Sequence, residues 1–134
     1  MYSLHGAQKI HVYSEKRIIK SSAVGETNEE EVRWLQDRVL EYAEEWKESG
    51  WGYVVGIGEM SPVSAEVSTE LVEFHKKLET AGCKALAFVK ADAFVISVQA
   101  KKHQKKSKAS YKEKYFATDE DAFAWIEKML SAKK

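Results

Sequence analysis

The chain has 134 residues, of which 44% are hydrophobic and 31% charged, and its 21 basic residues balance 21 acidic ones. These proportions are typical of a soluble globular protein and exclude an intrinsically disordered chain. The length is close to the commonest domain size, so we expect one domain over residues 1–134, with residues 1–7 flexible or loosely packed.

The cysteine content and the hydropathy indicate a compartment. Cys83 is the single cysteine, so no intrachain disulfide can form. The apolar runs are about six residues long, too short for a transmembrane segment, and residues 1–7 lack the apolar stretch of a signal peptide. A cytoplasmic protein is therefore predicted.

The first elements in chain order are two short strands. Residues 9–14 alternate between apolar and polar side chains, which predicts a strand with one buried face. Residues 17–24 predict a second strand, joined to the first by a hairpin turn at Glu15–Lys16, and Gly25 ends it.

A long amphipathic helix is expected next, over residues 29–48. Asn28 followed by Glu31 is a capping-box pattern. Apolar residues then recur every three or four positions, and Gly50 is the expected stop. The apolar stripe consists of Val32, Leu35, Val39, Tyr42, Ala43 and Trp46.

Two continuous apolar runs, residues 53–57 and 85–89, predict strands that are covered on both faces. Between them, Ser64 can cap a helix over residues 65–80. Its inner stripe is Val67, Leu71, Phe74, His75 and Leu78.

The remaining elements complete an alternation of strands and helices. Residues 92–106 predict a helix, although residues 94–98 also have a strand pattern. A short strand over residues 115–117 and a helix over residues 120–130, capped by Thr118, follow. The order predicts an α/β fold with a mixed, mostly parallel five-stranded sheet and about four helices.

Several stretches, in order and over nearly the whole chain, resemble the motifs of a known group. They are the Gly-Glu-Thr-Asn of residues 25–28, residues 51–55, residues 61–67, the Ala-Gly-Cys-Lys-Ala-Leu-Ala-Phe-Val of residues 81–89, and residues 116–126. Together they resemble the SpoIIAA-like (STAS-like) fold of anti-sigma-factor antagonists, and within it small bacterial proteins of uncharacterised role. The resemblance implies a single-domain regulatory fold and, by itself, no catalytic activity.

The resemblance also implies a candidate regulatory site in the loop before the second helix. Classical members carry there a serine or threonine, preceded by aspartate, that a partner kinase phosphorylates. Ser64 is the matching position and Ser61 is nearby, but Val63 stands where the aspartate would be. A helix N-terminus suits a phosphate or another anion. The alternative is that Ser64 acts only as a helix N-cap.

Charge is distributed unevenly along the chain. Residues 101–114 hold seven lysines and one acid, whereas residues 26–48 hold nine acids and three bases. The basic run is a candidate patch for phosphate, an anionic membrane surface or nucleic acid, or else a solvated segment. It has no arginine and one aromatic residue, so nucleic acid is disfavoured. Its candidate residues are Lys101, Lys102, Lys105, Lys106 and Lys108.

Four tryptophans are many for a small core. Trp34, Trp46 and Trp51 are therefore candidates for a dimer interface or an apolar groove. Packing in the core is the alternative interpretation of the same residues.

No motif for catalysis, cofactor or metal binding is found in the sequence. His5, His11, His75 and His103 have no metal-ligand spacing, and Cys83 is expected to be a small buried side chain. We therefore predict a non-enzymatic regulatory or protein-binding module without cofactor, with a partner protein or a second copy as its partner. A carrier or sensor of a small apolar or anionic ligand is the alternative, and an enzyme of unidentified type is the third.

Overall fold

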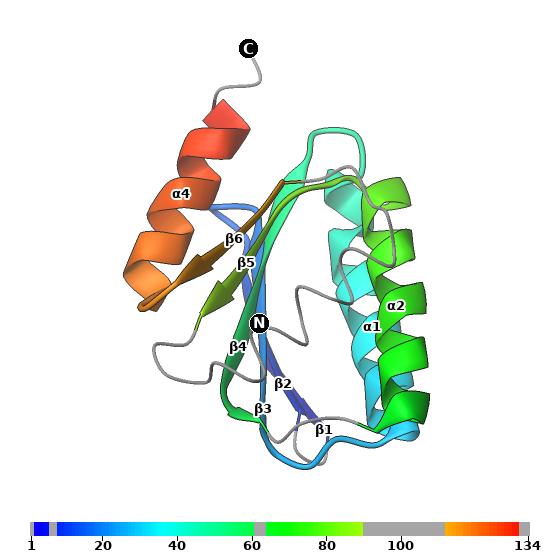
Figure 1. The fold of residues 1–134 in the computed structure, drawn as a ribbon. Helices are drawn as coiled ribbons and strands as arrows, with labels where there is room; N and C mark the ends of the chain where they lie inside the picture. The colour runs from blue at the N-terminus through cyan, green and yellow to red at the C-terminus, as the bar shows by residue number, and fades with distance from the viewer. Residues whose placement is uncertain (1, 6–7, 61–63, 90–111, 132–134) are drawn as a thin grey trace.

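The computed structural model describes residues 2–5, 8–60, 64–89 and 112–131 of the chain (Figure 1). Six strands are found there: β1 (Tyr2–His5), β2 (Gln8–Tyr13), β3 (Ile18–Gly25), β4 (Trp51–Met60), β5 (Cys83–Val89) and β6 (Lys112–Phe116). The helices are α1 (Glu29–Ala43), a short 3-10 helix η1 (Glu44–Trp46), α2 (Ala65–Thr80) and α4 (Asp119–Ser131).

The strands form one mixed sheet in the order β1-β2-β3-β4-β5-β6. The pairs β1–β2 and β2–β3 are antiparallel, and the pairs from β3 to β6 are parallel. The five predicted strands correspond to β2–β6, which confirms an α/β fold with a mostly parallel sheet. The sequence pattern did not predict β1, which adds a sixth strand at the edge.

The strand order decides which face of the sheet each helix covers. The β3–α1–β4 and β4–α2–β5 crossovers advance in the same direction across the sheet. Crossovers of one hand that advance in one direction place their helices on one face, and α1 and α2 do lie together there (Figure 1). Among the helices that the structure describes, α4, which follows the last strand, lies on the opposite face.

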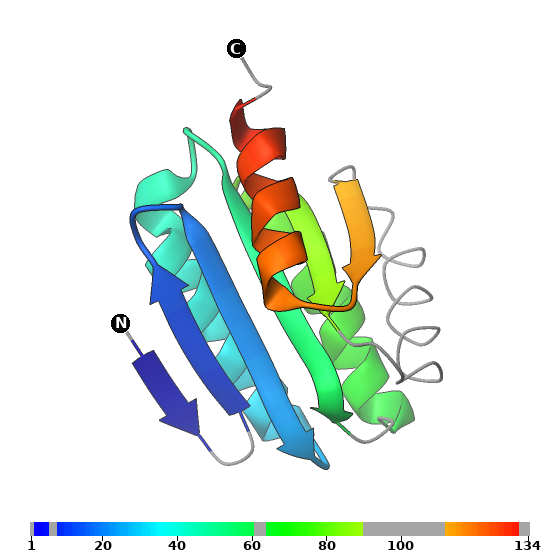
Figure 2. The same ribbon diagram turned by 90° about the vertical axis from the view of Figure 1, so that its left-hand side faces the viewer.

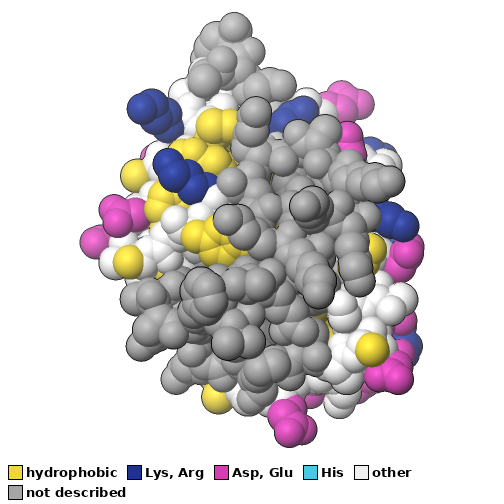
Figure 3. Space-filling view, in the orientation of Figure 1, with side chains coloured by type: hydrophobic (Ala, Val, Ile, Leu, Met, Phe, Trp, Pro, Cys, Tyr) yellow, Lys and Arg dark blue, Asp and Glu magenta, His cyan; other side chains and the backbone are white. Residues whose placement is uncertain are grey.

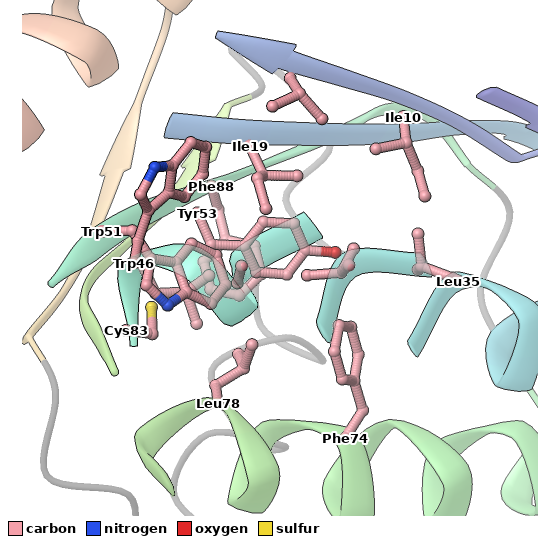
Figure 4. Close-up of a cluster of buried hydrophobic side chains, with 14 residues drawn as sticks. Ile10, Ile19, Leu35, Trp46, Trp51, Tyr53, Phe74, Leu78, Cys83 and Phe88 are labelled. Carbon is pink, nitrogen blue, oxygen red and sulfur yellow. The ribbon is translucent and has the colours of Figure 1, made fainter. Parts of the chain in front are cut away.

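The larger hydrophobic core lies between the sheet and the pair α1 and α2 (Figure 4). Trp51, Tyr53 and Phe74 are almost completely buried in it, and the Tyr53 and Phe74 rings meet edge to face with centroids 5.7 Å apart. Burying side chains of this size contributes about 2–3 kcal/mol each, so this face supplies most of the hydrophobic stabilisation.

The smaller core lies under α4. Its strand residues are small or β-branched, because α4 approaches the sheet closely. They are Ile18, Val54, Ala85 and Ala87, and they pack on the helix residues Ala122, Ile126 and Leu130. A Cβ atom placed on Gly52 of β4 would lie 2.2 Å from Cγ2 of Ile126, so the helix passes directly over that glycine.

The largest difference between predicted and observed helix ends is at the end of the first helix. The first helix was expected to continue to Glu48, but α1 ends at Ala43 and tightens into η1 through Trp46. Such tightening is common at the end of an α-helix. Gly50 follows with a φ of 93°, and its N–H donates to the Trp46 carbonyl at 2.8 Å.

Two of the predicted caps are observed. The Asn28 side chain accepts from the Glu31 N–H at 2.8 Å, and the Thr118 hydroxyl accepts from the Asp121 N–H at 3.2 Å. The helix predicted over residues 92–106 lies outside the described residues. Within the described part of the chain, no helix has both the length and the hydrophobicity to cross a bilayer.

Candidate functional site

The N-terminus of α2 holds the first candidate residue. Ser64 has extended backbone geometry, and its Oγ accepts a hydrogen bond from the Val67 N–H at 3.2 Å, so the residue is the N-cap of α2. The residue is also exposed, which leaves its hydroxyl accessible. The predicted N-cap is therefore observed, while a regulatory role for Ser64 stays a prediction. Ser61 lies outside the described residues.

The tryptophans proposed for an interface belong to the core. Trp51 is 0% exposed, and its indole N–H donates to the Ala81 carbonyl at 2.9 Å. Trp46 is 7% exposed in the same cluster, and Trp34 packs half-buried against it. Trp46 and Trp51 are thus not surface residues, because the β4 register and the end of α1 turn both rings inward (Figure 4).

Of the two charged segments, the structure describes the acidic residues 26–48 but only the last residues of the basic run 101–114. Lys101, Lys102, Lys105, Lys106 and Lys108 all lie outside the described residues, so the basic patch stays a prediction. The acidic segment forms α1 and η1, and its first turn carries three consecutive glutamates. Carboxylates in that position interact favourably with the helix dipole. Part of the acidic character therefore stabilises the helix.

Cys83 and His75 are both buried in the larger core. Cys83 is 3% exposed, and burial raises the pKa of its thiol to about 12. A nucleophilic cysteine needs the opposite shift and an accessible sulfur. His75 is 4% exposed on α2, beside Phe74. Among the residues the structure describes, no three His, Cys, Asp or Glu side chains lie together in a group that could hold a metal ion.

One buried polar pair was not predicted from the sequence. The hydroxyl groups of Ser21 on β3 and Tyr53 on β4 lie 2.6 Å apart inside the core. Burial raises the pKa of Tyr53 well above its ordinary value. One hydroxyl donates to the other, so the pair is hydrogen-bonded inside the core and links β3 to β4.

Half-buried aromatic side chains flank α4 on both sides. Phe123 meets Tyr13 of β2 edge to face, with centroids 4.8 Å apart, and Trp125 meets Phe116 of β6 at 5.5 Å. Figure 3 shows hydrophobic side chains, with charged ones among them, on the side of the molecule where α4 and β6 lie. These aromatic contacts hold the two flanks of the helix against the sheet.

The last candidate is the part of the sheet that α4 leaves open. Figure 2 shows α4 in front of β4 and β5, while β1, β2 and β3 face the viewer with no helix before them. We call the described side chains on that side of β2 and β3, beyond the rim formed by Tyr13, the open β2–β3 face. They are Lys9, His11, Lys20, Ser22 and Val24.

The geometry of the open β2–β3 face is regular. The His11 and Tyr13 rings stack with centroids 4.3 Å apart and planes 6° from parallel. Val24 is 52% exposed, so a large hydrophobic side chain of this face is in contact with solvent. The alternating pattern of residues 9–14 was the sequence signal for this face, because alternation indicates a strand wetted on one side.

Comparison with solved structures identifies the architecture. An uncharacterised protein of the DUF3478 family from Shewanella loihica, described as having a SpoIIAA-like fold, superimposes with a TM-score of 0.67 and 18% identity. The match covers 92% of this chain and 96% of that one. The fold is SpoIIAA-like.

A second structure with this SpoIIAA-like architecture comes from a complex. It is the crystal structure of the diguanylate cyclase SiaD with its activator SiaC from Pseudomonas aeruginosa, with a TM-score of 0.60 and 11% identity over 88% of this chain and 99% of that one. No family model matches the sequence. No curated protein matches it either.

The SpoIIAA-like fold confirms the resemblance recognised in the sequence motifs. Identities of 18% and 11% relate the structures at the level of fold. They assign no role to Ser64 or to the open β2–β3 face. Function must be argued from these surfaces themselves.

Proposed function

We propose that this chain is a non-enzymatic regulatory module that acts by binding a partner protein. The observation that carries the proposal is that its reactive side chains are either buried or engaged in helix capping. Cys83 and His75 are enclosed in the core, and the exposed Ser64 hydroxyl already caps a helix. The described residues thus offer surfaces rather than a reaction centre.

The structural neighbour SiaC supports the same proposal. That protein is named as the activator of a diguanylate cyclase and was crystallised with it. A SpoIIAA-like domain can therefore act by docking onto another protein. We extend that mode of action to this chain, without extending the identity of the partner.

Affinity capture from an extract of the encoding organism, followed by reconstitution from purified components, tests the proposal. We expect a stoichiometric complex on size-exclusion chromatography. Native mass spectrometry of the purified chain provides the second measurement. A retained small molecule with no protein partner would contradict the proposal and favour a ligand carrier, whereas a self-complex would make a second copy the partner.

Ser64 is the position at which we propose that binding is switched. Its hydroxyl is exposed at the N-terminus of α2, where free N–H groups and the helix dipole favour a negative charge. Aspartate caps helices as well as serine does. Ser64→Asp therefore adds charge without removing the cap.

We expect Ser64→Asp to change the affinity for the partner by about tenfold, which corresponds to about 1.4 kcal/mol. Thr69→Asp is the matched control, since it adds the same charge to an exposed position one turn further along α2. Equal affinities of both variants and the wild type, measured by titration calorimetry, would refute a switching role for Ser64.

A further inference from the structure

We propose that the open β2–β3 face is the docking surface, and that it takes an acidic segment of the partner that also carries an aromatic or aliphatic side chain. This inference rests on the proposed function as a protein-binding module. It adds the location of the binding surface and the chemistry of what binds there.

The open β2–β3 face differs from the rest of the sheet in how the described helices cover it. α1 and α2 cover one side, and α4 contacts β4, β5 and β6 on the other. The helix reaches the hairpin at its rim, where Phe123 meets Tyr13 and Lys16 pairs with Glu127 at 2.8 Å, and it reaches Lys20 of β3 through an ion pair with Asp119. Beyond that rim, Lys9, His11 and Val24 are exposed.

The charged residues of the open β2–β3 face favour an acidic partner. The β2 and β3 residues on this side provide two lysines and a histidine but no carboxylate. Lys20 is half-buried and ion-paired with Asp119 at the start of α4, whereas Lys9 is exposed. An acidic partner complements this surface.

The same charge argues against a second copy as the occupant. Two copies meeting face to face about a two-fold axis would bring the same basic residues of both chains together. Like charges at an interface cost free energy and disfavour the wrong partner. A symmetric dimer through this face would also carry no carboxylate from β2 or β3 to pair with Lys9.

The apolar content of the open β2–β3 face favours a protein segment over nucleic acid as the occupant. Val24 is half exposed on β3, two residues after Ser22. The stacked His11 and Tyr13 rings form a flat surface on β2. An aliphatic or aromatic side chain gains contact area on both. Sites for single-stranded nucleic acid instead combine aromatic platforms with a continuous basic groove, and this face contributes no arginine.

The test uses the random copolymer of glutamate and tyrosine as a probe, because it carries both acidic and aromatic groups. Chemical-shift mapping on the isotopically labelled full chain should show changes in the amide signals of β2 and β3. The lysine–tyrosine copolymer and a twelve-nucleotide oligothymidylate are the comparison ligands. Stronger binding of either one, or shifts centred on α1, α2 or α4, would overturn the proposal.

Variants then test the individual contributions. Lys9→Glu and Val24→Ser should each weaken binding of the glutamate–tyrosine copolymer, the former by about tenfold. Lys77→Glu is the matched control, since this exposed lysine lies on α2, on the other side of the sheet. Equal weakening by Lys77→Glu and Lys9→Glu would show that the effect is general electrostatics and would refute the site.

The outcome also separates this inference from the proposed function. If a captured partner binds wild type, Lys9→Glu and Val24→Ser equally well, the module function stands and the open β2–β3 face is the wrong surface. If the copolymer maps to this face but no protein partner is reconstituted, the surface stands and the module function fails. A concentration-dependent dimer that Lys9→Glu strengthens would make a second copy the occupant and overturn the acidic partner.

Discussion

Replacing Gly52 with alanine should strongly destabilise the fold, because this position is where α4 lies closest to the sheet. The added Cβ would lie 2.2 Å from Cγ2 and 3.0 Å from Cδ1 of Ile126, which is fully buried. Two non-bonded carbon atoms cannot approach to 2.2 Å, so either the Ile126 side chain leaves its rotamer or α4 moves outward. Overpacking of this kind costs about 1–3 kcal/mol.

A double-mutant cycle isolates the contact. Ile126→Ala alone removes the clashing methyl groups and leaves a cavity, at a cost of about 2–5 kcal/mol. In Gly52→Ala/Ile126→Ala the new methyl group enters part of that cavity. We therefore expect the double variant to be more stable than the sum of the single losses predicts, by about 1–3 kcal/mol.

Urea unfolding followed by tryptophan fluorescence measures all three variants. Gly56→Ala is the matched control on the same strand, since its Cβ would meet the Ser22 Cβ at 3.2 Å, the flexible end of Lys20 at 3.6 Å and the Ser21 carbonyl oxygen at 3.7 Å, all longer than the 2.2 Å contact at Gly52. Its loss of stability should be much smaller than that of Gly52→Ala. Equal losses at both glycines, or strictly additive effects in the cycle, would show that α4 does not pack over Gly52 as described.

Two further predictions concern a second glycine and the buried thiol. In urea unfolding, Gly82→Ala should lower the free energy of unfolding more than Gly25→Ala does. Both glycines have positive φ, but a Cβ atom on Gly82 would lie 2.2 Å from the Lys47 carbonyl oxygen, whereas a Cβ atom on Gly25 would have no neighbour within 4 Å. The buried Cys83 thiol keeps its proton in the fold to about pH 12, while the unfolded chain releases it near 9.0, so stability is lost as the pH rises above 9. Between pH 9 and 11 the wild type should lose about 2 kcal/mol more than Cys83→Ala, and equal slopes would place the thiol in contact with water.

The elements that could be predicted from the sequence are those whose signals are local. The Asn28 and Thr118 caps mark where α1 and α4 begin, and a side chain that satisfies a free N–H group is visible within four residues of sequence. Continuous hydrophobicity in residues 53–57 and 85–89 likewise indicated strands covered on both faces, and β4 and β5 are the strands that lie between α4 and the α1–α2 pair.

The features that were missed depend on distant partners. The indole of Trp51 is buried because a carbonyl thirty residues away, that of Ala81, accepts its hydrogen bond. Ser21 and Tyr53 pair because β3 and β4 adopt one particular parallel register, and no local pattern specifies that register. β1 is four residues long and has little pattern of its own, so its pairing with β2 is a tertiary effect.

The position of α4, and therefore the open β2–β3 face, follows from two independent constraints. One helix is about 10–12 Å wide and strands are spaced about 4.8 Å apart, so a single helix covers two or three strands of a six-stranded sheet. It settles where Gly52, Ala85 and Ala87 permit close approach. A shift toward β2 would bury the exposed Lys9, and burying a charged group is costly. The residues that attract α4 to β4 and β5 and those that keep it off β2 thus act in the same direction, and the open face is a consequence of the sequence rather than an accident of packing.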